Sequence, residues 1–253
     1  MLELKIMGYC ESFREKWDDF VMNHSVNGTF LQTRRFLEYH RNRFEDVSLV
    51  IYKGNDTVVA VIPACAICDE GKKEFCAHCG STFGGIVMSD LFYDIEHVDA
   101  VMTVLESTLR KQGYHRVRLK LTSEIFAGQN GNLLYYFLFQ RGYSSYDELS
   151  CYIDFASYDE DIASNFTSGR RRDYKYSLKN ELTFQKLGER QQIADFYGIL
   201  CGNLEKFGAK PVHSFEELLE FKESRLLDIV EFYGVYHENQ MIAGSMVFLF
   251  GSQ

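Results

Sequence analysis

The sequence contains little that would break a folded chain or carry it into a membrane. It has only two prolines among 253 residues, and its hydrophobic content is 46%, a composition typical of a folded globular protein without disordered tails. The longest apolar runs, around residues 58–68 and 133–139, are far shorter than the roughly 20 residues of a membrane-spanning helix. No basic segment followed by an apolar block marks a signal peptide. We therefore expect a soluble cytoplasmic protein with no membrane span.

Positive charge is also in deficit. The chain has 27 Lys and Arg against 36 Asp and Glu, a net charge of -9, which argues against broad nucleic-acid binding but leaves room for a local basic patch. Seven cysteines, an odd number, favour reduced thiols over a disulfide framework. The length allows one large domain or two ordinary ones.

One stretch, residues 168–179, runs against the acidic balance. Read as a helix, it places Tyr174 and Leu178 on an inward face beside a basic stripe. Arginines in a first turn oppose the positive end of the helix dipole, whereas guanidinium groups match phosphate or carboxylate oxygens. The pattern therefore predicts either an oxyanion-binding site or a solvated charged face. The cations of this stretch are Arg170, Arg171, Arg172, Lys175 and Lys179.

Hydrophobic periodicity predicts a mixed α/β chain. Two helices are expected within residues 11–44, the second capped by Thr29, and a later helix is expected to begin at Ser214 with Glu217 completing a capping box. The other expected helices cover residues 95–112 and 132–140 and a long segment after residue 187. The expected strands cover residues 48–52, 57–62, 74–79, 86–88, 115–121, 143–155, 182–187, 229–236 and 241–250.

The last predicted hairpin repeats the first. Residues 52–60 align with residues 236–244 at a constant offset of 184, and a capped helix precedes each hairpin. Self-similarity at a long offset indicates a duplicated domain. We predict a first domain over residues 1–156 and a second over residues 157–253. Because the first copy continues for about 90 residues beyond its hairpin, we expect the second copy to be truncated.

Several motifs carry a family resemblance. They are a tryptophan helix followed by Gly-Thr-Phe-Leu-Gln-Thr (residues 17–36), the glycine-rich residues 80–86, the Arg-Arg-Arg-Asp helix (170–173), Lys-Pro-Val-His-Ser (210–214) and residues 235–244. Together they resemble the GNAT acyltransferase superfamily, above all its duplicated Fem-type (FemAB-like) branch and acetyltransferase-like relatives. The resemblance implies a GNAT-like fold: a central, mostly antiparallel mixed sheet flanked by helices, in two related domains.

The resemblance also implies a reaction and a site. An acyl or aminoacyl group would pass from acyl-CoA or aminoacyl-tRNA, used as a co-substrate with no tightly bound cofactor, to an amine. The acceptor would be a small molecule or a cell-envelope, peptidoglycan or polysaccharide precursor, and tRNA is a possible partner. The five cations above would hold an anionic donor or acceptor, with Tyr174 and Tyr176 facing the cleft and His213 as a binding residue or base. Neither a catalytic base nor an oligomeric state follows from the sequence.

The sequence departs from the pattern of the family at the expected binding site for the acyl donor. The usual acyl-CoA signature, Gln/Arg-x-x-Gly-x-Gly/Ala at the start of a helix, is missing from the sequence. Residues 80–85 lead into a predicted strand instead, so their glycines are expected at turns and close-packed positions.

Four cysteines form a C-x2-C-x7-C-x2-C pattern: Cys65, Cys68, Cys76 and Cys79. Two such pairs are a zinc signature at longer spacing, and a hairpin turning near Lys72 would set the pairs opposite each other. Strand residues three apart face opposite sides, however, so the four thiols converge only if the strands are broken. We expect buried free thiols, with structural zinc as the alternative and no catalytic metal.

Two rival functions remain open. One is a non-catalytic binding or scaffold protein that keeps a transferase fold. The other is a zinc-stabilised nucleic-acid-binding module, which the acidic net charge disfavours.

Overall fold

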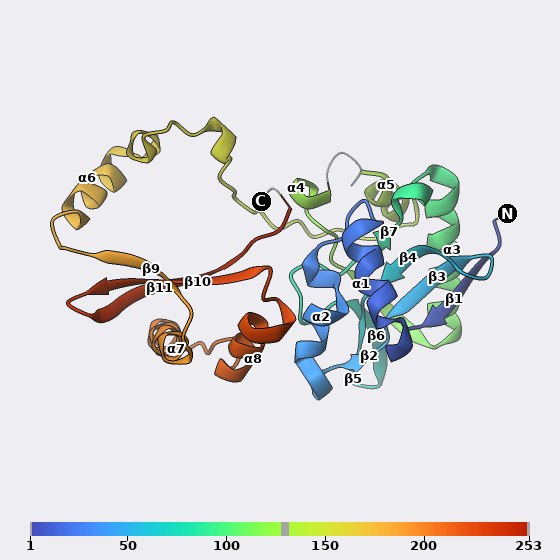
Figure 1. Ribbon diagram of the computed structural model, residues 1–253. Helices are drawn as coiled ribbons and strands as arrows, with labels where there is room; N and C mark the ends of the chain where they lie inside the picture. The colour runs from blue at the N-terminus through green and yellow to red at the C-terminus, as the bar shows by residue number, and fades with distance from the viewer. Residues whose placement is uncertain (1, 128–131, 252–253) are drawn as a thin grey trace. The chain divides into compact units, whose positions relative to one another are not determined.

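A computed structural model describes residues 2–127 and 132–251 (Figure 1). The chain divides into two compact units, Met1–Ser145 and Tyr146–Gln253. The predicted domain boundary after residue 156 lies within the second unit, and the predicted outer limits, residues 1 and 253, lie outside the described residues. Within the described part of the chain, no helix is both long and apolar enough to cross a membrane.

The first unit contains most of the strands. Its helices are α1 (Arg14–Asn23), α2 (Arg34–Leu37), α3 (Ile95–Lys111), α4 (Glu124–Ala127) and α5 (Asn132–Gln140). Its strands are β1 (Leu4–Gly8), β2 (Glu45–Asp46), β3 (Leu49–Lys53), β4 (Thr57–Ile62), β5 (Cys65–Asp69), β6 (Lys72–Ala77), β7 (Val87–Met88) and β8 (Tyr114–Leu119).

These strands form two four-stranded sheets, with orders β1-β3-β4-β7 and β2-β5-β6-β8. β6 and β8 run parallel, whereas the other described pairings are antiparallel. The chain passes between the two sheets several times, and two of these passages lie between β4 and β5 and between β6 and β7. Residues 78–86 therefore lie where the strands separate.

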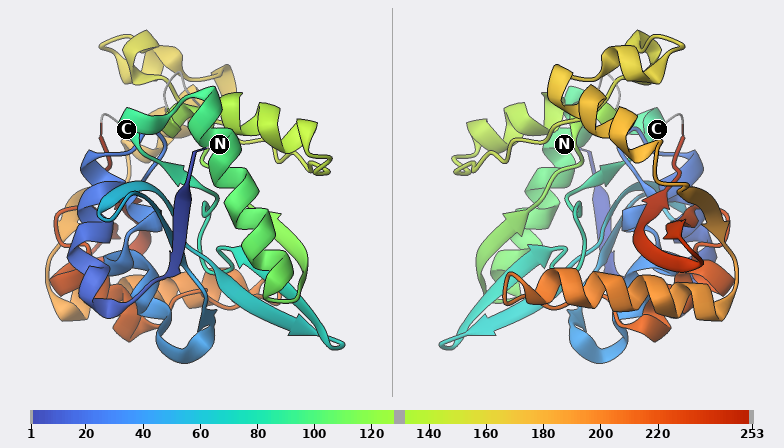
Figure 2. Two further views of the ribbon diagram at one scale, coloured as in Figure 1. Left: turned by 90° about the vertical axis from the view of Figure 1, so that its right-hand side faces the viewer. Right: turned by 90° about the vertical axis from the view of Figure 1, so that its left-hand side faces the viewer.

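Successive side chains of the first sheet point to opposite faces, and both faces are covered by helices. Ile51, Ala60 and Ile62 point into the core that includes α3, and α3 contributes Val98, Val101, Met102, Leu105 and Leu109. Val50 and Val61 point to the other face, where they pack with Trp17 and Phe20 of α1. Figure 2 shows α3 extending along the strands of this unit. The amphipathic helix and the first hairpin predicted from the sequence are confirmed.

The second unit is built around one smaller sheet, with the order β11-β10-β9. Its strands are β9 (Thr183–Leu187), β10 (Val230–His237) and β11 (Gln240–Phe248), and its helices are α6 (Ser168–Ser177), α7 (Arg190–Glu205) and α8 (Phe215–Glu220). The predicted capping box of Ser214 and Glu217 is present. α7 packs on β11, where Phe196 stands over Gly244.

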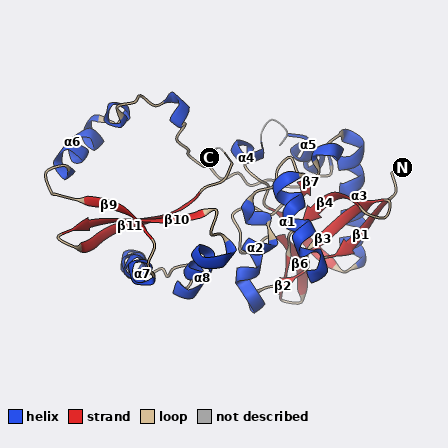
Figure 3. Cartoon of the chain, viewed as in Figure 1, coloured by secondary structure: helices blue, strands red, loops and turns tan. Residues whose placement is uncertain are grey.

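The strand predicted over residues 143–155 is wrong. The structure shows extended loop and a short helical turn there (Figure 3), and its apolar side chains, such as Leu149 and Tyr152, are exposed. The alternation that suggested a strand is present, but the segment pairs with no other described strand. A strand needs hydrogen-bonding neighbours, which local sequence does not supply.

Candidate functional site

The predicted basic helix exists as α6, but it has no buried face. No residue between Ser168 and Ser177 is buried, and Tyr174 and Leu178 are 43% and 66% exposed. The predicted inward face is therefore wrong. The spacing of Tyr174 and Leu178 does place them one helical turn apart, but it cannot reveal whether another element packs against them.

Two of the predicted binding residues help to hold the start of α6. The guanidinium group of Arg171 donates hydrogen bonds to the carbonyl oxygens of Ala163 (3.0 Å), Ser164 (2.8 Å) and Phe166 (3.1 Å). The ring of Tyr174 packs edge-on against the ring of Phe166, with centroids 5.7 Å apart. Arg171 thus satisfies carbonyl groups of residues 163–166, which precede α6, so its donors are directed to the backbone.

The other cations of residues 168–179 remain available. The side chains of Arg170, Lys175 and Lys179 make no hydrogen bond or ion pair within the described part of the chain, and Arg172 lies 4.0 Å from Asp173 in an exposed pair. Tyr176 is also exposed. Cations are unfavourable near the N-terminus of a helix, so an anion at Arg170 would relieve a repulsion as well as form a contact.

His213 lies in the same unit, immediately before the Ser214 cap of α8. Its half-buried ring packs edge-on against Phe221, with centroids 5.2 Å apart. This contact gives His213 a packing role. The prediction that it binds substrate or acts as a base is not tested by the contact.

The cysteine hairpin has a different register from the one predicted. Its turn consists of Glu70 and Gly71, both with positive φ (47° and 76°), as a two-residue turn of type I′ requires. Cys65 therefore lies opposite Cys76, and Cys68 lies opposite Lys73. The predicted turn near Lys72 is displaced, because turn position decides register and the sequence offered more than one candidate.

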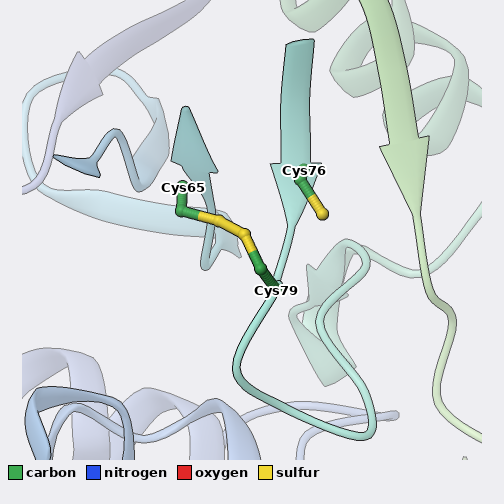
Figure 4. Close-up of side chains that lie close together, drawn as sticks. All are labelled: Cys65, Cys76 and Cys79. Carbon is green, nitrogen blue, oxygen red and sulfur yellow. A yellow bond between two sulfur atoms is a disulfide. The ribbon is translucent and has the colours of Figure 1, made fainter. Parts of the chain in front are cut away.

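Cys65 and Cys79 form a disulfide with a Cα–Cα distance of 6.6 Å (Figure 4), so the expectation of free thiols is wrong for this pair. Cys76 remains a free, buried thiol beside it, and the three sulfur atoms lie within 4.8 Å of one another. Cys68 is exposed and does not belong to this group. The structure thus brings together three of the four predicted cysteines.

The start of α3 is acidic. The Asp94 carboxylate accepts hydrogen bonds from the backbone N–H of His97 (2.9 Å) and pairs with His97 Nδ1 (2.7 Å). The hydrogen bond from the His97 backbone, with the nearby imidazole, lowers the pKa of Asp94. Glu96 adds a second carboxylate to this first turn. A phosphate would meet negative charge at this helix end.

The Asp94–His97 pair extends to a lysine. His97 Nε2 lies 3.1 Å from Lys53 Nζ, at the end of β3, and Lys53 lies over the ring of Phe92. Sequence reasoning missed this chain of three polar residues because Lys53 and His97 are 44 residues apart. The hairpin turn after Lys53 and the helix over residues 95–112 were both predicted, but the meeting of Lys53 with His97 depends on how α3 packs.

A second missed feature is a buried polar network beside residues 78–86. Gln32 is fully buried; its Nε2 donates to the carbonyl of Gly84 (3.0 Å) and to Thr122 (2.7 Å), and its Oε1 accepts from the backbone N–H of Thr29 (2.6 Å). The ring of Trp17 donates to the Gln32 carbonyl (2.8 Å). These contacts fix the segment where the two sheets separate, since buried polar groups must be paired.

The glycines of that segment permit close contacts, as predicted. A Cβ on Gly84 would lie 2.0 Å from the Ala77 carbonyl carbon, and a Cβ on Gly80 would lie 1.9 Å from the His40 ring. Burial lowers the pKa of the neighbouring His78 to about 4. The segment is thus a tightly packed piece of the scaffold.

These features define the class of fold. Mixed, mostly antiparallel sheets are flanked by helices, and the chain has the GNAT/Fem-like fold that the sequence predicted. Among solved structures it is similar to FemX, with a TM-score of 0.58 and 15% sequence identity, over 91% of this chain and 57% of the FemX chain. The chain thus spans little more than half the length of that protein. At this identity the likeness shows the fold alone.

Two further solved structures match less closely. A GNAT family acetyltransferase from Staphylococcus aureus has a TM-score of 0.37 and 11% identity, over 59% of this chain and 98% of that protein. Glucosamine-6-phosphate N-acetyltransferase from Arabidopsis thaliana has a TM-score of 0.33 and 20% identity, over 60% and 99%. No protein-family model and no curated protein sequence matches the chain.

Proposed function

We propose that this chain is a cytoplasmic N-acyltransferase of the GNAT/Fem type, which moves an acyl or aminoacyl group onto an amine. The observation that carries the proposal is the fold shared with FemX over 91% of the chain. The donor would be acyl-CoA or aminoacyl-tRNA, used as a co-substrate. The acceptor would be an amine on a small molecule or on a peptidoglycan or polysaccharide precursor.

The open cations of α6 support an anionic ligand. Arg170 and Lys175 lie on an exposed helix, and Lys179 lies just after its end, in a chain of net charge -9, so their local field is opposite in sign to that of the whole molecule. Lysine and arginine bind phosphate and carboxylate oxygens. A phosphorylated precursor or the backbone of a tRNA would match them equally well.

The acidic start of α3 bears on where a donor could bind. Asp94 and Glu96 would repel the phosphates of coenzyme A at this helix end, so a CoA site there is disfavoured. The donor phosphates would instead require cations such as those of α6.

The chemistry needs orientation above all. The amine nitrogen attacks the acyl carbonyl carbon, and the carbon–sulfur bond of a thioester, or the ester bond of a charged tRNA, breaks. The amine loses a proton to water or a side-chain base, and the leaving sulfur or oxygen gains one. Holding the two reactants in line can lower the barrier by several kcal/mol, up to about 10.

The test is an acyl-transfer assay with labelled acetyl-CoA and, separately, with charged tRNA, against phosphorylated amino sugars and muropeptide precursors. Turnover with one donor is expected. The double variant Arg170→Ala/Lys175→Ala should lower kcat/KM by about tenfold or more, the equivalent of 1.4 kcal/mol. Lys206→Ala/Lys210→Ala removes the same charge from exposed positions of the same unit and should leave kcat/KM near the wild-type value.

Each outcome has a distinct meaning. Absence of turnover with every donor, by a folded protein, would overturn the transferase proposal and favour a binding protein with a transferase fold. Turnover that is equally affected by both double variants would show that α6 is not part of the binding site, and the proposed activity would still stand.

A further inference from the structure

Three cysteine sulfurs meet in the first unit in a way that differs from ordinary core packing. Cys65 begins β5, Cys76 lies directly opposite it on β6, and Cys79 follows the end of β6. All three sulfur atoms lie within 4.8 Å of one another (Figure 4). A zinc ion with Zn–S bonds of about 2.3 Å holds neighbouring sulfurs about 3.8 Å apart. The Cys65 and Cys79 sulfurs are bonded to each other, so reduction must separate them before the group reaches this spacing, whereas the Cys76 sulfur already lies within 4.8 Å of both.

The convergence of Cys76 and Cys79 has a local cause. Residues three apart on a continuous strand face opposite sides, but β6 ends at Ala77 and the chain turns at once. The Gly80 N–H donates to His78 Nδ1 (3.1 Å), and the Ser81 N–H donates to the His78 carbonyl (3.3 Å). This turn lets a C-x2-C pair point to one place. The turn is the break in the strand without which Cys76 and Cys79 would face opposite sides of the sheet.

We propose that the reduced protein binds one zinc ion at Cys65, Cys76 and Cys79. The fourth coordination position would be taken by water or an external ligand. The Cys65–Cys79 disulfide would be the oxidised, metal-free form of the same site. The chain would thus carry a zinc centre that oxidation empties.

The conversion balances in two steps. An external dithiol or phosphine supplies two electrons, and with two protons the Cys65–Cys79 bond becomes two thiols. Zinc then displaces one proton from each of the three thiols as three Zn–S bonds form, because only thiolates ligate the metal. Oxidation of the Cys65 and Cys79 thiolates by two electrons re-forms the disulfide and releases the ion.

The surroundings favour a thiophilic ion. Cys65 and Cys76 are 0% and 5% exposed, so an ion bound there must lose most of its water. Thiolates are poor ligands for a hard, strongly hydrated cation, whereas they bind zinc well. Cys79 is half-buried and provides access to the site. Burial raises the pKa of the Cys76 thiol and the Glu74 carboxylate adds to the rise, while Arg118, which is paired with Glu74, opposes it.

Cys68 provides the matched control. It lies on β5 three residues after Cys65, but it is exposed, opposite Lys73 and outside the sulfur group. Any zinc signature read from sequence spacing alone would include it. The structure excludes it, and this difference makes the proposal testable at single residues.

The experiment measures zinc on the full chain in two redox states. Protein is reduced with a phosphine, desalted without oxygen, equilibrated with Zn²⁺ and analysed for metal after gel filtration. We expect one zinc per reduced chain in the wild type and in Cys68→Ser, and none on the oxidised wild type. Cys76→Ser should still form the disulfide, but its reduced form should bind zinc more than about 100-fold more weakly, since even supporting residues of metal sites are worth 10- to 100-fold.

A second measurement does not depend on a variant that must fold. Zinc-loaded and zinc-free reduced wild type are alkylated, and the labelled cysteines are identified by mass spectrometry. Zinc should protect Cys65, Cys76 and Cys79 and leave Cys68 reactive. Reduced protein that retains no zinc, equal loss of zinc in Cys68→Ser, or protection that does not follow this division would each overturn the proposal.

Discussion

Tyr52 and Tyr236 occupy the same irregularity in two hairpins. The β3–β4 register shifts between Ile51 and Tyr52, and the β10–β11 register shifts between Val235 and Tyr236. The sheets agree as well, because β1-β3-β4 and β9-β10-β11 have the same order and two helices precede each hairpin. A bulge repeated at one position in each copy supports the proposal of a duplicated domain.

The two hairpins differ in their turns. Tyr52 pairs with Val58, whereas Tyr236 pairs with Met241, so the second turn is one residue shorter. The constant offset of 184 read from the sequence holds for the first strand of each hairpin but not for the second. An ungapped comparison could not detect the change, since register is set by turn length.

Arg34 is expected to be a main determinant of stability in the first unit. It is buried, it pairs with Asp46, donates to Ser48 (3.2 Å), and its guanidinium group lies 3.7 Å from the centroid of the Tyr9 ring. Arg34→Met should lower the free energy of unfolding by about 3 kcal/mol, because it leaves carboxylates of a partly buried cluster without their cation. Urea unfolding followed by the fluorescence of Trp17, the single tryptophan of the chain, measures the loss.

The control for this prediction is Arg116→Met. Arg116 is 75% exposed and lies 3.6 Å from Glu74, so its removal should cost less than about 1 kcal/mol. A similar loss in both variants would show that burial of the Arg34 pair is not what stabilises the unit.

Asp46 should make the same cluster sensitive to acid. Burial opposes ionisation of Asp46, but the charge of Arg34 and the hydrogen bonds from Arg34 and Ser48 outweigh it and lower its pKa below the ordinary value of 3.8. As the pH falls, the unfolded chain therefore takes up this proton first. The stabilisation is complete above about pH 4 and is lost as the pH falls through the folded-state pKa.

Asp46→Asn is expected to be less stable than the wild type near neutral pH, with the difference shrinking in acid. Unfolding curves between about pH 7 and pH 3 give the dependence. Asp69→Asn, at an exposed position of β5, should show no such convergence. A constant difference between wild type and Asp46→Asn across the series would contradict the assignment.

Local chemistry predicted much of the fold. The apolar face of α3, the first hairpin and the Ser214 cap depend on residues close in sequence, and each was correct. The predicted strand over residues 143–155 failed because pairing partners are not encoded locally. Likewise, the spacing of Tyr174 and Leu178 described a helix face without saying whether anything covers it.

The cysteines show the same limit. The sequence contained the zinc-like spacing, but the register of the hairpin decided that Cys65, Cys76 and Cys79 meet while Cys68 is excluded. That register depends on the Glu70-Gly71 turn. A preference for Gly at positive φ was available as a signal, and it could have been used to place the turn.

Gly84 is expected to tolerate no side chain. Its N–H donates to the Lys120 carbonyl (2.9 Å), its own carbonyl accepts from Gln32, and an added Cβ would lie 2.0 Å from the Ala77 backbone. Gly84→Ala should destabilise the first unit by about 2 kcal/mol or more, because backbone on both sides must shift. Trp17 fluorescence during urea unfolding again provides the measurement.

Gly169 gives the opposite expectation. It lies in α6 with open space around it, so Gly169→Ala should stabilise that helix by up to about 1 kcal/mol. Helix content from circular dichroism should rise or stay constant. If Gly84→Ala were equally harmless, the close packing of residues 78–86 would not be a constraint on the fold.

Charge reversal in α6 can separate stability from binding. Arg170 lies in the first turn of the helix and Lys179 just after its end, so the helix dipole opposes the first cation and favours the second. Arg170→Glu should stabilise α6 by about 0.3–1 kcal/mol, and Lys179→Glu should destabilise it by a similar amount. Hydrogen exchange of the backbone amides over residues 171–178 reports these changes, as slower exchange in the first variant and faster exchange in the second.

If both cations bind an anionic substrate, both variants should nevertheless lose acyl-transfer activity. Activity that instead follows helix stability, rising in Arg170→Glu and falling in Lys179→Glu, would mean that α6 supports the fold and does not bind the substrate.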